Sequence, residues 1–151
     1  MIVFIGCVKN KKPYGTKACE LYDSTFFNKC FQYAKSLNPS VIYILSAKYG
    51  VVKLDEFIEP YDKTLNSMSK SERLSWADMV HTQLTELNVD FEDEVVWLCG
   101  AKYRQGLIKY FTHNNCPLEG MGIGCQLSFM TNALCGTSYK TQRFENSVTL
   151  W

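Results

Sequence analysis

The sequence predicts an α/β protein with a single Rossmann-like domain, in which helices flank a small, mostly parallel sheet. Two observations lead to this class. Short apolar runs rich in β-branched residues, over 1–7, 41–45 and 94–99, have the length and composition of buried strands. Longer segments with apolar residues every three or four positions separate these runs, and that spacing is typical of amphipathic helices.

The first half of the chain predicts a strand–helix–strand unit. A strand is expected over 1–7, and a helix within 18–36 is expected to begin near Ser24, whose hydroxyl suits an N-cap. The strand over 41–45 follows. A connection of this kind makes the two strands parallel and gives a right-handed crossover.

The second half predicts three more helices. One is expected within 67–89, with its start at Ser69 or Ser71, and the others over 103–110 and 127–135. The buried stripe expected on the first of these helices consists of Leu74, Ala77, Met79, Val80, Leu84 and Leu87. Proline and glycines within 116–124 predict a strand followed by a turn. The domain is expected to span 1–151.

Composition bounds the function. The chain has 151 residues, a common size for one domain, and its hydrophobic content of 46% is ordinary for a globular protein. The net charge of +1 argues against a protein that coats nucleic acid through a broad basic surface. The 9 Tyr, 9 Phe and 3 Trp residues are numerous enough for base or sugar stacking, although core packing explains them equally well.

No cofactor, metal or membrane is expected. The 7 cysteines contain no C-x-x-C pair, and the 2 histidines have no neighbour at metal-ligand spacing. The first residues lack the features of a signal peptide, and no apolar run reaches the roughly 18 residues of a membrane span. These features predict a reduced protein in the cytoplasm. Phosphate-loop and dinucleotide-binding glycine motifs are absent, and neither histidine follows a predicted strand, so no serine–histidine–acid triad is expected.

Reactive side chains follow the ends of the three predicted strands. Cys7 and Lys9 follow the first, Ser46 and Lys48 the second, and Lys102 the third. Ligands of open parallel sheets bind outside the carboxyl ends of the strands. We therefore expect these side chains to converge on one ligand.

The residue types at these ends favour an anionic ligand. Lys9 and Lys11 beside small residues suit a phosphate or a developing oxyanion, and their charges would activate Cys7 as a nucleophile. The alternative is a solvated basic loop with Cys7 packed as a small apolar side chain. Gly50 permits a positive φ or close approach of a ligand, while a simple turn would also explain it.

Six segments, in order along the chain, resemble a bacterial and phage family of small domains of unknown function. They are Cys7-x-Lys9-x-Lys11, Ala18-x-x-Leu21-Tyr22-x-Ser24-x-x-Phe27, Ile44-Leu45-Ser46-Ala47-Lys48-Tyr49-Gly50, Pro60-Tyr61-Asp62-x-Thr64-Leu65, Gly100-x-x-Tyr103 and Pro117-Leu118-x-Gly120-x-x-Ile123-Gly124. The resemblance extends over about 1–134. The third and fourth segments are also similar to the YaaA family, which is associated with peroxide stress and DNA binding.

A weaker similarity is to the catalytic core of archaeosine synthase, where a cysteine precedes Lys-Pro-Tyr. Here Lys12-Pro13-Tyr14 follows Cys7, but the serine and histidine of that motif are not matched. Together these resemblances imply a Rossmann-like sheet, a nucleobase or nucleic-acid substrate, and a site at the strand ends.

The combined prediction is an enzyme that cleaves or remodels a nucleobase in nucleic acid or in a nucleotide, as a glycosylase does. The expected catalytic residues are Cys7, Lys9, Ser46, Lys48 and Asp62, with Asp55 as an alternative to Asp62 for activating water. The expected substrate-binding residues are Lys11, Tyr14, Tyr22, Tyr49, Gly50, Tyr61, Lys102 and Tyr103. The alternative is a non-catalytic module that binds nucleic acid or a nucleotide, in stress response or phage–host conflict.

Overall fold

The structure is a computed structural model of the chain, and it describes residues 1–136. The strands are β1 (Ile2–Gly6), β2 (Thr16–Lys17), β3 (Val41–Ser46), β4 (Gly50–Lys53), β5 (Phe57–Ile58), β6 (Glu94–Leu98) and β7 (His113–Asn115). The helices are α1 (Ala18–Leu21), α2 (Thr25–Ser36), α3 (Lys70–Glu86), α4 (Ala101–Arg104) and α5 (Ile123–Gly136), and the 3-10 helices are η1 (Leu65–Ser67) and η2 (Ile108–Tyr110). The predicted extension of the domain to Trp151 lies outside the described residues.

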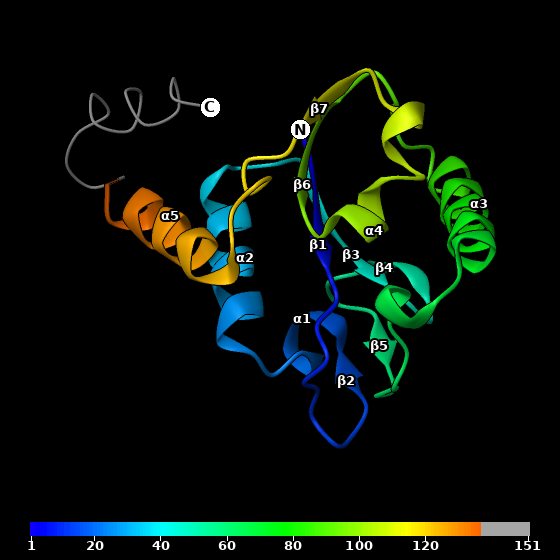
Figure 1. Cartoon of the computed structure of the whole chain (residues 1–151), viewed down its shortest axis with the longest axis horizontal. Coiled ribbons are helices and arrows are strands. Elements are labelled where there is room, and N and C mark those ends of the chain that lie inside the picture. The colour runs from blue at the N-terminus through cyan, green and yellow to red at the C-terminus, as the bar shows by residue number, and fades with distance from the viewer. Residues whose placement is uncertain (137–151) are drawn as a thin grey trace.

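The main sheet has the strand order β4-β3-β1-β6-β7 (Figure 1). Strand β1 lies at its centre and pairs in parallel with β3 and β6, and β7 pairs in parallel with β6. Val3 and Ile5 belong to the core on one face of β1, and Ile2 and Phe4 to the core on the other. Burial on both faces explains why this strand is apolar at every position. The predicted α/β class is confirmed.

Helices cover both faces of the sheet. On one face, α2 and α5 pack together and bury Phe27, Cys30 and Met130 against the strands. On the other face, α3 contributes Trp76 and Leu84. Figure 1 shows these helices on opposite sides of the strands, which leaves the ends of the strands free to carry a site.

The structure confirms the predicted helix starts. Ser24 is the N-cap of α2, and its hydroxyl accepts a hydrogen bond from the Phe27 N–H. Ser69 begins α3 with a capping box, in which the Ser69 and Glu72 side chains each accept from the other residue's N–H. Both serines satisfy N–H groups that a helix start leaves unpaired.

The predicted stripe of α3 is wrong at two positions. Leu74 and Met79 are 48% and 39% exposed, whereas Trp76 is buried. With roughly 100° of rotation per residue, Trp76, Val80 and Leu84 follow one line along the helix. Leu74 and Met79 fall on either side of that line, beyond the face that meets the sheet.

Two elements differ from prediction after β6. The helix predicted over 103–110 is split into α4 and η2, and a methyl group added at Gly106 would lie 2.7 Å from Cβ of Ala77. This close approach to α3 is where the helical path breaks. The strand predicted within 116–124 lies earlier, at β7, whose residues His113–Asn115 are all exposed. An exposed edge strand has no apolar pattern to reveal it.

An antiparallel hairpin from β3 to β4 was not predicted. Gly50 turns the chain with φ +78°, a conformation that favours glycine. The Gln83 side chain from α3 lies against Gly50; it accepts from the Val51 N–H and donates to the Tyr49 carbonyl. The predicted positive φ of Gly50 is confirmed. Gly50 is also buried, and the Gln83 side chain occupies the space where a ligand was expected to approach.

Candidate functional site at the strand ends

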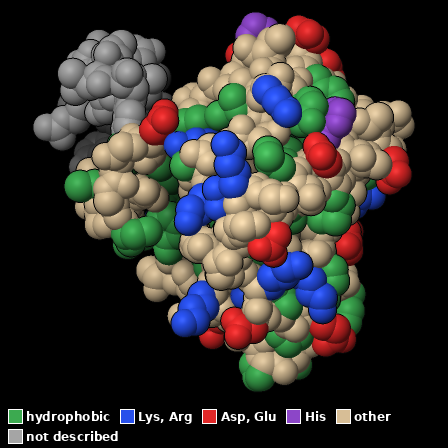
Figure 2. Space-filling view, turned by 45° about the vertical axis from the view of Figure 1, so that its right-hand side comes forward, with side chains coloured by type: hydrophobic (Ala, Val, Ile, Leu, Met, Phe, Trp, Pro, Cys, Tyr) green, Lys and Arg blue, Asp and Glu red, His purple; other side chains and the backbone are tan. Residues whose placement is uncertain are grey.

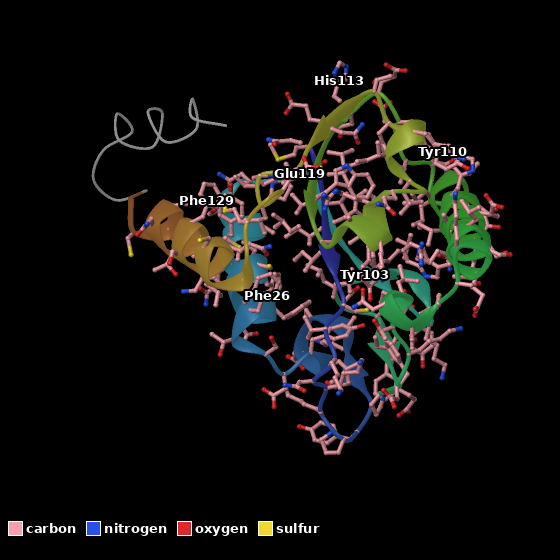
Figure 3. The ribbon with its side chains drawn as sticks, in the orientation of Figure 1. Phe26, Tyr103, Tyr110, His113, Glu119 and Phe129 are labelled. Carbon is pink, nitrogen blue, oxygen red and sulfur yellow. The ribbon has the colours of Figure 1, made fainter. Side chains whose placement is uncertain are left out.

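The ends of β1 and β3 bring Cys7 and Ser46 to the same edge of the sheet. The Cys7 N–H donates to the Leu45 carbonyl at 3.0 Å, which continues the pairing of β1 with β3 by one residue. The Cys7 sulfur lies 3.2 Å from the Tyr103 hydroxyl, and Figure 3 shows Tyr103 reaching from α4 toward the end of β1. Cys7 at the end of β1 therefore contacts Tyr103 of α4, which follows β6, whereas the residue expected from that third strand end was Lys102.

Ser46 anchors a chain of hydroxyl groups beneath this edge. The Ser46 hydroxyl donates to the Tyr61 hydroxyl at 2.8 Å, and the Tyr61 hydroxyl lies 2.7 Å from that of Tyr22. Ser46 also accepts hydrogen bonds from the backbone N–H groups of Lys48 and Tyr49. Because Ser46 is 0% exposed and uses its only proton on Tyr61, it positions Tyr61 instead of presenting a nucleophile.

The phenol groups near the strand ends keep their protons at neutral pH. Burial is the main cause that raises the pKa of Tyr22, Tyr61 and Tyr103, and the nearby Cys7 thiol raises each of the three further. These hydroxyls therefore act as hydrogen-bonding groups at neutral pH, and not as phenolate bases.

Lys11 covers the outer side of the same phenols. Its ammonium lies 4.4 Å from the ring centroid of Tyr61 and 5.8 Å from that of Tyr22, and it donates to the Lys9 carbonyl. Burial lowers the pKa of Lys11, while Cys7 and Asp62 partly oppose this effect. A lowered pKa makes the ammonium a better proton donor than that of an exposed lysine.

A hollow of about 720 Å³ opens over Lys11 and Tyr61. Its volume lies within the range of about 300–1,000 Å³ that small-molecule sites occupy. Its lining combines amines, one amide, two carboxylates and a phenol, from Lys9, Asn10, Lys11, Lys12, Pro13, Asp23, Pro60, Tyr61 and Asp62. The Lys12 and Asp23 N–H groups bond to the Leu21 and Asn10 carbonyls and hold the 9–13 loop against 21–23. Tyr61 joins residues 60–62 to them, because its hydroxyl lies 2.7 Å from that of Tyr22 and the Lys11 ammonium lies over its ring.

Two of the predicted lysines point elsewhere. Lys48 is exposed, with its ammonium 5.2 Å from the Tyr49 ring centroid, and Lys102 donates to the Asn66 carbonyl at 3.5 Å. Neither lines the hollow, whereas Lys9 does. The expected convergence of three lysines on this hollow is wrong, because long side chains at strand ends follow their local turns and not the direction of the strand.

The remaining predicted residues surround the site at different depths. Tyr49 packs edge-on against Tyr61, with ring centroids 5.6 Å apart, and is a support for it. Tyr14 is 58% exposed beside the hollow. Asp62 is exposed and lines the hollow, whereas its sequence alternative, Asp55, is exposed without lining it.

Sequence reasoning missed five lining residues and one support. Asn10, Lys12, Pro13, Asp23 and Pro60 line the hollow. Trp76 donates from its indole N–H to the Ser46 carbonyl, 30 residues away in the sequence. The lysine run and the Pro-Tyr-Asp turn were a signal for the lining, but no local pattern reveals a contact between α3 and the end of β3.

Two further properties concern the whole described part of the chain. Among residues 1–136, no group of three or more His, Cys, Asp or Glu side chains is arranged to hold a metal ion. None of the helices in the same residues combines the length and apolar character needed to cross a membrane. Figure 2 shows Lys and Arg side chains next to Asp and Glu side chains, without a continuous basic surface on that face.

The fold and the site define a Rossmann-like α/β domain with a polar hollow at the carboxyl ends of its strands. The chain belongs to DUF6884, a family of unknown function, whose model matches residues 2–132. Every residue of the hollow lies within the matched part. Neither the curated proteins nor the solved structures gave a match to the chain.

Proposed function

We propose that the protein hydrolyses the N-glycosidic bond of a nucleotide unit bound in the hollow. The single observation that carries this proposal is the composition of the lining, in which Lys9, Lys11 and Lys12 stand beside Tyr61 and the carboxylate of Asp62. Such a hollow combines cations for a phosphate, an aromatic surface for a base and an acid–base pair for chemistry.

The lysines provide the affinity for phosphate. Lys9 and Lys12 lie on the loop that follows β1, at the edge where ligands of parallel sheets bind. Both ammonium groups belong to the lining, and the structure gives neither of them a salt bridge within residues 1–136. Charge-assisted contacts from such groups suit the oxygens of a phosphate.

Tyr61 provides the contact with the base through the part of its side chain that lines the hollow, next to the Lys11 ammonium over its ring. Its hydroxyl accepts from Ser46 and bonds to Tyr22, and Tyr49 packs against its ring. A ring fixed on two sides loses little freedom when a base binds, so it forms a preorganised surface. The raised pKa of Tyr61 keeps its hydroxyl protonated beside the ligand.

Asp62 and Lys11 supply the proton transfers. Asp62 takes a proton from water as the water oxygen bonds to C1′ of the sugar, and the C1′–N bond breaks with its electron pair going to the base. Lys11 donates a proton to the departing base. Its lowered pKa suits this role, and solvent then returns the proton from Asp62 to Lys11.

The resemblance to YaaA-like proteins and to the archaeosine synthase core supports a nucleobase substrate. The YaaA resemblance is carried by the segments with Ser46 and with Tyr61 and Asp62, and the archaeosine synthase similarity by Cys7 with Lys12-Pro13-Tyr14. Lys12, Pro13, Tyr61 and Asp62 line the hollow. The segment with Ser46 contributes the buried anchor of Tyr61.

One observation favours a second candidate, a nucleotide-binding module without turnover. Ser46 is buried and fully hydrogen-bonded, and the Cys7 sulfur contacts Tyr103. Two of the predicted catalytic residues are therefore engaged in holding the site together. A module of this kind would use the same lysines and the same phenol.

Release of free base separates the two candidates. The full chain is incubated with nucleoside monophosphates and with oligonucleotides, free bases are quantified by chromatography, and binding is measured in parallel by calorimetry. Base release that Asp62→Asn abolishes and the exposed α3 variant Asp78→Asn leaves intact supports the hydrolase. Binding without release supports the module, and the absence of both overturns the proposal.

A further inference from the structure

Two exposed aromatic side chains come from neighbouring segments at the tip of the molecule that carries the hollow. Tyr14 is 58% exposed and Phe57 is 64% exposed. Gly15, next to Tyr14, lies under the Phe57 ring, since a methyl group added there would be 2.6 Å from Cζ of Phe57. We define Tyr14 and Phe57 as the aromatic strip.

The fold holds this strip in place. Thr16–Lys17 pairs with Phe57–Ile58 in the two-stranded sheet of β2 and β5, so Phe57 cannot move away from the chain that follows Gly15. Ile58 is buried in the core, while Phe57 points outward. The carboxylate of Glu59 also faces Gly15, 2.7 Å from the position of the same methyl group.

The strip continues the hollow. Pro13 lines the hollow, and Tyr14 is the next residue; Pro60 lines it from the other side, three residues after Phe57. Figure 1 shows the loop between β1 and β2 at the lower tip of the molecule, beside β5. The other large apolar side chains that are exposed in residues 1–136 are Leu74, Met79 and Ile123, on α3 and α5.

Single exposed apolar residues are common on soluble proteins and need no explanation. Two flat rings that adjoin a lysine-lined hollow are a different case, because single-stranded nucleic acids bind through aromatic surfaces and cations together. The surrounding charges are mixed, since Lys12 and Lys17 lie near Glu20, Glu56 and Glu59. Figure 2 shows hydrophobic side chains at this lower end among both signs of charge. Stacking therefore contributes more here than electrostatic attraction does.

We infer that the substrate is a single-stranded nucleic acid whose target nucleotide enters the hollow while an adjacent base stacks on Tyr14 or Phe57. This inference rests on the proposed function and names its substrate class. A base can stack on an aromatic side chain only when it has left its own base pair. A duplex would therefore have to unpair the target base and its neighbour before binding. A free nucleotide fills the hollow and leaves the aromatic strip unused.

The test compares affinities for three probes: a nucleoside monophosphate, a short single strand, and the same strand in a duplex. Fluorescence anisotropy and calorimetry on the full chain give the dissociation constants, with Asp62→Asn added to prevent turnover. We expect the single strand to bind at least about tenfold more tightly than the monophosphate, since one base–aromatic stack is worth roughly that factor or more. Tyr14→Leu and Phe57→Leu should remove most of this advantage, and Phe57→Leu should leave monophosphate binding unchanged.

Conservative variants and a matched control show whether the aromatic rings cause the tighter binding of the single strand. Tyr14→Phe and Phe57→Tyr keep the ring and should retain the advantage, and Ile123→Ala removes an exposed apolar side chain elsewhere and should leave it unchanged. Melting temperatures show that each variant is folded.

The outcomes distinguish this inference from the function on which it rests. If the monophosphate binds and the single strand binds no more tightly, or if the leucine variants retain the advantage, the aromatic strip is not a stacking surface and the proposed function stands. Tighter binding of the duplex than of the strand also overturns the inference. If no probe binds, the proposed function fails and the inference fails with it.

Discussion

The α3 face of the central strand and the carboxyl end of that strand use aromatic side chains in different ways. On the α3 face, Phe4 stacks on Trp97 with ring centroids 4.7 Å apart, and Phe111 contacts both. At the carboxyl end of the strand the aromatics are tyrosines, and Tyr22 and Tyr61 are linked through their hydroxyls. The comparison shows that the abundance of aromatics alone does not indicate ligand binding, because the rings of one region pack in the core while the tyrosines of the other are joined by hydrogen bonds beside the hollow.

The largest expected effect comes from a substitution in the packed aromatic core on the α3 face. Phe4 is 0% exposed, and Phe4→Ala should lower the free energy of unfolding by about 3–5 kcal/mol because it leaves a cavity between Trp97 and Tyr43. Urea unfolding measures the loss. Nucleotide affinity, measured at a temperature where the variant is folded, should equal that of the wild type. A large loss of affinity in the folded variant would show that the aromatic core and the hollow are not independent.

The next effect concerns chemistry at the hollow. Asp62→Asn should reduce base release by about 100-fold, since general acid–base groups contribute roughly that factor or more. Stability should hardly change, because Asp62 is exposed. Asp55→Asn provides the comparison, as the sequence left both carboxylates open as candidates, and equal losses from the two variants would reject the assignment to Asp62.

A smaller effect concerns the hydroxyl chain beneath the hollow. Ser46→Ala removes one donor and the acceptor of two backbone N–H groups at a residue that is 0% exposed, and should cost about 2 kcal/mol of unfolding free energy. Base release should fall much less than in Asp62→Asn, because Ser46 acts through Tyr61. If the alanine variant is fully stable yet inactive, Ser46 is a catalytic residue and not a support.

The smallest effect is a shift of the pH profile. A general acid must be protonated, so base release should decline as the pH rises through the pKa of Lys11, which burial places below that of an ordinary lysine. Lys11→Arg keeps the charge and titrates only above about pH 12, so it should extend the alkaline limb of the profile to higher pH. An unchanged limb in this variant would assign the decline to another group.

The sequence predicted most of the fold for reasons that can be named. The buried strands β1, β3 and β6 are apolar along most of their length, and their polar residues, Ser46 and Glu94, lie at strand ends. Ser24 and Ser69 mark the starts of α2 and α3 through a local hydrogen bond. The β7 strand escaped prediction because its residues are exposed. Local rules describe bonding within a few residues, and they succeed where the structure depends on such bonding.

The site was predicted less completely, because its contacts join distant parts of the chain. The Tyr22 and Tyr61 hydroxyls are 39 residues apart in the sequence, and only the folded chain shows that they bond to each other. Lys48 and Lys102 follow strands just as Lys9 does, yet Lys48 lies over the Tyr49 ring and Lys102 donates to the Asn66 carbonyl. The direction of a lysine side chain depends on the turn that carries it, which residue types alone do not reveal.

The measurement that tests the central claim most directly is the affinity for a nucleoside monophosphate across four lysine variants. Lys9→Ala and Lys12→Ala alter the lining of the hollow. Lys102→Ala alters a lysine that the sequence placed at the ligand but that does not line the hollow, and Lys70→Ala is a control at the start of α3. The account predicts that the dissociation constant rises about tenfold in each of the first two variants and stays within about twofold in the others. A loss confined to Lys102→Ala, or equal values in all four variants, would contradict a nucleotide site in the hollow.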